Sequence, residues 1–165
     1  MIKPIAVREA AKYVEDGWYV LVIVRRPGKL QKYIDSTENV FLIQDLAPSD
    51  ELMGIVDEFK KRDIWNQENF DRYFVKRFLL EILKNEKAKA MLSRISKASK
   101  AGKKFALACF CGDEKMCHRS IVAGLLEGVG NEFEGFNYSP YMLDYLIYEH
   151  ALKQQKEKEN AGQIR

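Results

Sequence analysis

The chain has 165 residues, of which 47% are hydrophobic and 31% charged, which is enough for one domain around a single core. This composition excludes a disordered chain, a collagen-like chain and a small disulfide-stapled scaffold. The formal net charge of +3 is too small to support nucleic acid as a partner. We expect a single domain over residues 1–152, followed by a polar, frayed tail over residues 153–165.

The apolar segments and the cysteines indicate the cellular compartment of the protein. No apolar run approaches the roughly 18 residues of a membrane span, and the first residues open no signal-peptide h-region. The three cysteines, Cys109, Cys111 and Cys117, are crowded into one segment, whereas a secreted disulfide framework has an even, dispersed set. We therefore expect a soluble cytoplasmic protein without a membrane partner, whose cysteines serve the chemistry of a site.

The first half of the chain alternates helical and strand patterns. Apolar residues recur at helical spacing from Val7 to Val14, and Gly17 follows where a helix commonly ends. The unbroken apolar run 18–24 is typical of a strand covered on both faces, so we expect a central parallel strand there. A second strand is expected over 40–43, and Ser49 is a good N-cap for the helix that follows.

The second half continues this alternation. Its expected elements, in order, are a helical stretch over 70–83, a helix over 88–98, a strand over 105–109, a helix over 118–129 and a helix over 140–153. Short apolar strands separated by helices predict an α/β fold with a Rossmann-like, mostly parallel sheet flanked by helices. In such sheets, ligands bind beyond the carboxyl ends of the strands.

The helix expected from residue 118 opens with polar and reactive side chains. One hypothesis makes Cys117 a catalytic thiolate, because a helix N-terminus and the neighbouring cations favour the ionised form of the thiol. His118 is then its proton partner, and Arg119 and Ser120 bind a phosphate or carboxylate group. This hypothesis describes a small enzyme that acts on a phosphate-bearing or nucleotide-like substrate.

Two other interpretations of the same segment stay open. In one, the segment holds zinc or an iron–sulfur cluster through three thiolates and one imidazole, from Cys109, Cys111, Cys117 and His118. The spacing Cys-x-Cys-x5-Cys-His is not the usual Cys-x2-4-Cys knuckle. In the other, the cysteines are small buried hydrophobes and the polar residues only cap a helix.

Further candidate site residues stand at the ends of the first two expected strands. Arg25 and Arg26 follow the run 18–24, and two guanidinium groups there favour an anionic substrate. Asp45 follows the second strand, where it is either a general base or a turn residue before Pro48.

Two stretches together resemble a known family. The segment 46–52 reads Leu-Ala-Pro-Ser-Asp-Glu-Leu, and Trp65 and the segment 70–73 follow it. With the Cys-His-Arg-Ser sequence of residues 117–120 after a hydrophobic strand, this order is similar to the domain of unknown function 488 family, over most of residues 18–130. The resemblance implies an α/β fold and important roles for the Cys-His-Arg residues, and it implies no reaction.

The chain departs from the family pattern at one place. Family members typically carry an acidic residue shortly before an arginine at the end of the first strand. Arg25 matches the arginine, but Ile23 and Val24 stand near the acidic position. The resemblance therefore gives no metal or base role to that position in this chain.

Overall fold

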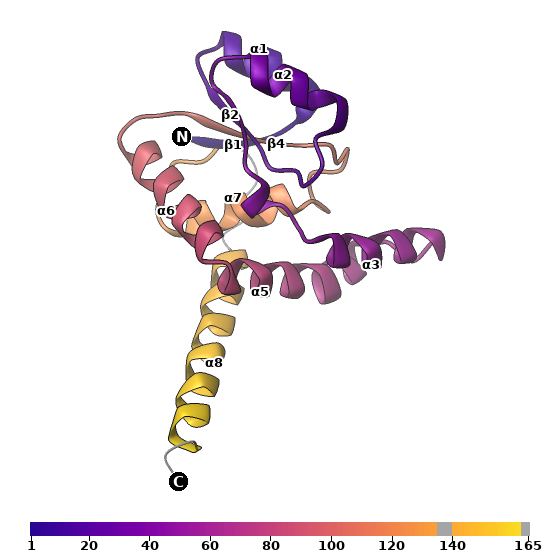
Figure 1. Cartoon of the computed structure of the whole chain (residues 1–165), viewed down its shortest axis with the longest axis vertical. Helices are drawn as coiled ribbons and strands as arrows, with labels where there is room; N and C mark the ends of the chain where they lie inside the picture. The colour runs from indigo at the N-terminus through magenta and orange to yellow at the C-terminus, as the bar shows by residue number, and fades with distance from the viewer. Residues whose placement is uncertain (135–139, 163–165) are drawn as a thin grey trace.

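The computed structural model describes residues 1–134 and 140–162. These residues form one sheet of parallel strands in the order β1-β4-β2-β3, with helices on both faces (Figure 1). The strands are β1 Ile2–Ala6, β2 Tyr19–Val22, β3 Val40–Leu42 and β4 Phe105–Cys109. A parallel sheet of this kind needs cover on both faces, which the apolar strand sequences already indicated.

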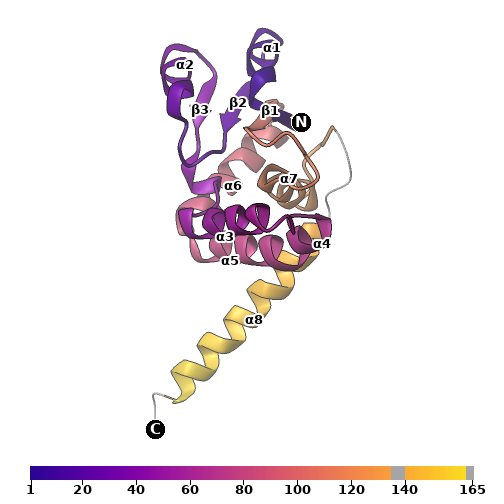
Figure 2. The same ribbon diagram turned by 90° about the vertical axis from the view of Figure 1, so that its right-hand side faces the viewer.

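The helices divide between the two faces of the sheet. In chain order they are α1 Ala10–Glu15, α2 Gln31–Ser36, α3 Asp50–Lys61, α4 Gln67–Asn69, α5 Lys76–Lys84, α6 Glu86–Lys100, α7 His118–Gly128 and α8 Pro140–Gly162. Helices α1 and α2 lie on one face, whereas α6 and α7 lie on the other, with α3 and α5 beyond them (Figures 1 and 2). The C-terminal part of α8 projects away from this body (Figure 2).

Alternation of side chains along the strands produces two cores. Val20 and Val22 face α1 and α2, and Leu21 and Ile23 face the larger helical layer. In β4 all side chains are buried, because the strand has a neighbour on each side and helices above and below. The end of β4 is therefore a buried, well-fixed place for a site.

The prediction of a mostly parallel α/β sheet is confirmed, and the run 18–24 does contain a central strand. The strand over 105–109 has the predicted bounds, and the Ser49 side chain accepts a hydrogen bond from the Leu52 backbone N–H at 3.1 Å, as an N-cap does. The Rossmann-like label and the division into a domain over 1–152 with a tail stay predictions.

The structure differs from the prediction in four elements. Strand β1 was not expected, because it is short and contains Pro4, which edge strands tolerate. Helix α2 was also missed, and residues 70–75 form a π-helical segment between α4 and α5. Helix α8 continues to Gly162 instead of ending near residue 153, with i,i+4 side-chain pairs such as Gln155 with Glu159 along its exposed part.

Among the described residues, no helix has the length and apolar character needed to cross a membrane.

Candidate metal centre

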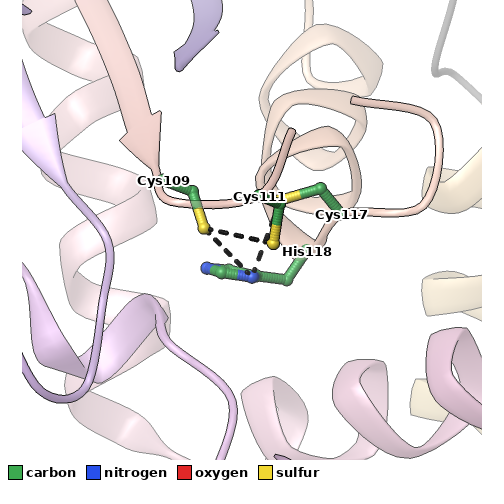
Figure 3. A group of neighbouring side chains, drawn as sticks. All are labelled: Cys109, Cys111, Cys117 and His118. Atoms are coloured by element: carbon green, nitrogen blue, oxygen red, sulfur yellow. Dashed lines mark hydrogen bonds between the residues drawn. The ribbon is translucent and has the colours of Figure 1, made fainter. Parts of the chain in front are cut away.

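Four side chains meet at the carboxyl end of β4. Cys109 is the last residue of the strand, Cys111 lies in the loop after it, Cys117 is the N-cap residue of α7, and His118 is the first residue of that helix. Figure 3 shows the three sulfur atoms and the imidazole ring turned toward one another. We call these four residues the Cys3His cluster.

The ligand atoms of the Cys3His cluster lie close enough together to hold one metal ion. The Cys109 and Cys111 Sγ atoms are 3.6 Å apart, and His118 Nδ1 lies 3.9 Å from the Sγ atoms of both Cys109 and Cys117. All four ligand atoms lie within 4.8 Å of one another. With zinc bonds of about 2.3 Å to sulfur and about 2.0 Å to nitrogen, the edges of a tetrahedron are about 3.5–3.8 Å.

A hydrogen bond at the second ring nitrogen fixes the orientation of His118. Its Nε2 atom lies 2.7 Å from the backbone oxygen of Ile23, at the end of β2. Because a carbonyl only accepts, Nε2 carries the proton, and Nδ1 presents a lone pair to the three sulfur atoms. The Phe78 ring meets the imidazole edge-on at a centroid distance of 5.7 Å. A metal-ligating histidine typically has such a carbonyl partner on its second nitrogen.

Arg119 supports the loop that carries the cluster. Its side chain is 2% exposed and donates from Nη1 to the carbonyl oxygens of Cys111 at 3.0 Å and Cys109 at 3.4 Å. No carboxylate of the described residues forms an ion pair with this guanidinium group. A buried cation needs a counter-charge, and the Cys111 thiol, whose pKa the Arg119 charge helps to lower, can supply it.

Hydrogen bonds among the cysteines shift the pKa values of their thiols in opposite directions. The bond that Cys109 donates to Cys111 raises the pKa of Cys109 to about 11 and lowers the pKa of Cys111 to about 2. Burial raises the pKa of Cys117 and lowers the pKa of His118. These shifts favour ionisation of Cys111, whereas burial of Cys117, whose side chain is 1% exposed, opposes its ionisation. The catalytic role of Cys117 stays a prediction.

Arg119 and Ser120, the predicted anion-binding pair, form hydrogen bonds with backbone oxygens inside the protein. Ser120 is fully buried, and its hydroxyl donates to the backbone oxygen of Glu114. The Nη1 atom of Arg119 is likewise occupied by backbone carbonyls. Both side chains thus hold the loop between β4 and α7, and neither lines the cavity beside the cluster.

A cavity of about 400 Å³ lies next to the Cys3His cluster, between the end of the sheet and α3. Its lining residues are Val24, Arg25, Arg26, Pro48, Asp50, Met53, Gly54, Asp57, Cys109, Phe110, Cys111 and His118. The structure therefore brings the two predicted arginines and three of the four cluster residues to one cavity. This volume is at the small end of ligand pockets, which suits a ligand of mononucleotide size or smaller.

The arginines also tie the end of β2 to the start of α3. Arg25 donates to the carbonyl oxygens of Pro48 at 3.2 Å and Ala47 at 3.0 Å, and Arg26 forms an exposed ion pair of 2.8 Å with Asp50. Asp45 lies in a 3-10 turn after β3 and is not among the residues that line the cavity. A role for Asp45 as a general base stays a prediction.

Comparison with known proteins places the chain in a family. Residues 2–130 match the family model described as the active DUF488-N3 subclade. The chain belongs to the DUF488 family. The matched range contains the Leu-Ala-Pro-Ser helix start and the Cys-His-Arg-Ser segment, although the description names neither a reaction nor a ligand. No curated protein and no solved structure shows significant similarity to the chain.

Sequence reasoning missed several residues of the site. The backbone oxygen of Ile23 orients His118, and a carbonyl group leaves no signature in a sequence. Met53 and Asp57 line the cavity from α3, where their i,i+4 spacing places them on one face of the helix. Phe110 lines the cavity and is 54% exposed, and its place between two cysteines was the signal available in the sequence.

Proposed function

We propose that the Cys3His cluster binds one zinc ion. The observation that carries this proposal is the convergence of three sulfur atoms and His118 Nδ1 within 4.8 Å, with the proton of the ring held on Nε2 by Ile23. Three thiolates and one imidazole are a common donor set for zinc. A single ion fits better than an iron–sulfur cluster, because a cluster distributes its ligands over several irons.

Charge balance supports the same proposal. Three thiolates and Zn²⁺ together carry a net charge of −1, and the buried Arg119 guanidinium carries +1 beside them. The bound zinc site and Arg119 are then neutral together inside the protein. Neither the zinc complex nor the arginine is left as an uncompensated buried charge.

The test is elemental analysis of tag-free protein purified without oxygen, with thiols counted on the same sample. We expect one equivalent of zinc per chain and three thiols that react only after a chelator is added. His118→Gln should lose most of the zinc. His150→Gln is the matched control, because it changes the other histidine, which is exposed on α8. Protein without metal, with three thiols that react at once, would overturn the proposal.

A second candidate function is a small enzyme that acts on a phosphate-bearing or nucleotide-like substrate. The cavity supports it, because Arg25 and Arg26 line the same space as Cys111 and His118. Titration calorimetry with inorganic phosphate and with adenosine monophosphate tests this function. We expect Arg26→Gln to weaken binding, whereas Arg62→Gln, which changes an exposed arginine outside the cavity, should leave it unchanged. If neither inorganic phosphate nor adenosine monophosphate binds, this second function is refuted.

A further inference from the structure

The four residues of the Cys3His cluster differ in their burial and anchoring. Cys109 and Cys117 are 3% and 1% exposed, and His118 is 6% exposed. These three residues belong to the end of a buried strand or to the start of a helix. Cys111 is only half-buried and lies in the connecting loop, one residue before Gly112. Its side chain has the most freedom to leave the cluster.

The cavity approaches the cluster from the same side. It is lined by Cys111, Cys109 and His118, but not by the buried Cys117. A ligand in the cavity therefore meets the metal position next to the Cys111 sulfur. Departure of Cys111 would leave two thiolates and one imidazole, the Cys2His set that is found in catalytic zinc sites with one open position.

We propose that Cys111 is an exchangeable ligand of the zinc ion, and that a small anion in the adjacent cavity takes its place. This inference rests on the proposed zinc site. The incoming anion donates a lone pair to zinc, and Cys111 leaves as a thiolate that takes a proton from solvent through the cavity. No electron is transferred in this exchange.

The charges around the site select an anion as the incoming ligand. With Cys111 bound, the zinc complex has a net charge of −1 that the buried Arg119 cation offsets. An incoming monoanion preserves this balance, whereas a neutral ligand leaves one positive charge uncompensated.

The cavity wall itself carries mixed charge. Asp50 is paired with Arg26, so Arg25 and Asp57 are the remaining charged side chains of the wall outside the cluster. Met53 and Phe110 add an apolar surface. The ligand class is thus a small anion with an apolar body, and Asp57 opposes its entry.

The experiment uses Co²⁺ in place of zinc, because its visible spectrum reports the ligands, and azide as the anionic probe. We compare the full-length wild type with Cys111→Ala and Cys117→Ala. Cys111→Ala should keep one equivalent of Co²⁺, and azide should change its spectrum with saturation at concentrations about tenfold or more below those needed by the wild type, because no thiolate competes. Cys117→Ala should retain no stoichiometric metal.

A second change tests the role of the cavity. Asp57→Asn in the Cys111→Ala background should tighten azide binding by about threefold to tenfold, because one opposing charge is removed. The inference is overturned if Cys111→Ala loses Co²⁺ as completely as Cys117→Ala, or if azide leaves its spectrum unchanged. In both cases wild-type protein with one bound metal ion would still support the zinc site, so the two proposals fail separately.

Discussion

Replacing Arg119 by methionine removes a buried cation and two hydrogen bonds while keeping most of the side-chain volume. The bond to the Cys111 oxygen, at 3.0 Å, has good length, and the bond to the Cys109 oxygen, at 3.4 Å, is weaker. With about 1.5–3 kcal/mol for a hydrogen bond from a charged donor, the pair contributes roughly 2–4 kcal/mol to fixing the loop. Removal of the buried charge offsets part of this loss, so the free energy of unfolding is a poor readout.

Zinc affinity is the diagnostic quantity for Arg119→Met. The variant loses the support of the Cys111 loop and the cation that balances the zinc complex, and both losses weaken metal binding. We expect the dissociation constant to rise by about 10- to 100-fold, the usual effect of losing an outer-shell partner, which corresponds to about 1.4–2.7 kcal/mol.

Competition with a chromophoric chelator measures this dissociation constant. Arg25→Met is the matched control, because Arg25 also donates to two backbone carbonyls but is exposed to solvent. Its effect should stay below about threefold, because water screens its charge. Equal zinc affinity in wild type and Arg119→Met would refute the assigned role of Arg119.

Three further predictions concern stability. Ser49→Ala removes the N-cap of α3 and the hydroxyl that donates to Glu81, so urea unfolding should show a loss of about 1–3 kcal/mol, and a change below about 0.5 kcal/mol would contradict this. Removal of zinc by a chelator should lower the melting temperature by several degrees, and re-addition of zinc should restore it; an unchanged melting temperature would count against a metal that binds only the folded chain. In metal-free protein, burial lowers the pKa of His118 below its ordinary 6.5, so the unfolded chain takes up the proton first. The contribution of neutral His118 to the free energy of unfolding should be fully present above about pH 6.5 and should be lost as the pH falls through the lowered pKa. His118→Gln should remove this pH dependence, whereas His150→Gln should retain it.

The sequence predicted those parts of the site that depend on local patterns. The apolar run ending at Cys109 identified a buried strand, and the residues after Cys117 identified a helix start, so the convergence of the cysteines at a sheet edge followed from the architecture. Ser49 was identifiable for the same reason, since an N-cap is a local arrangement. The cluster itself was one of three open interpretations, because spacing alone does not show where a loop turns.

The parts that the sequence did not predict depend on long-range packing. The partners of Arg119 are carbonyl oxygens in a loop whose path no local pattern specifies, and its predicted role in anion binding stays a prediction. The burial of Cys117, which raises the pKa of its thiol, depends on packing that the local sequence does not show. Strand β1 pairs with β4, about a hundred positions away in the chain, and its short sequence with Pro4 gave no strand signal.

X-ray absorption spectroscopy at the zinc edge of the purified protein identifies the atoms that bind the metal ion. We expect three sulfur neighbours at about 2.3 Å and one nitrogen neighbour at about 2.0 Å. Cys111→Ala, which should keep its metal, should show two sulfur neighbours, whereas His118→Gln should hold too little zinc to give a spectrum. A shell of oxygen and nitrogen neighbours without sulfur would contradict zinc binding by Cys109, Cys111, Cys117 and His118.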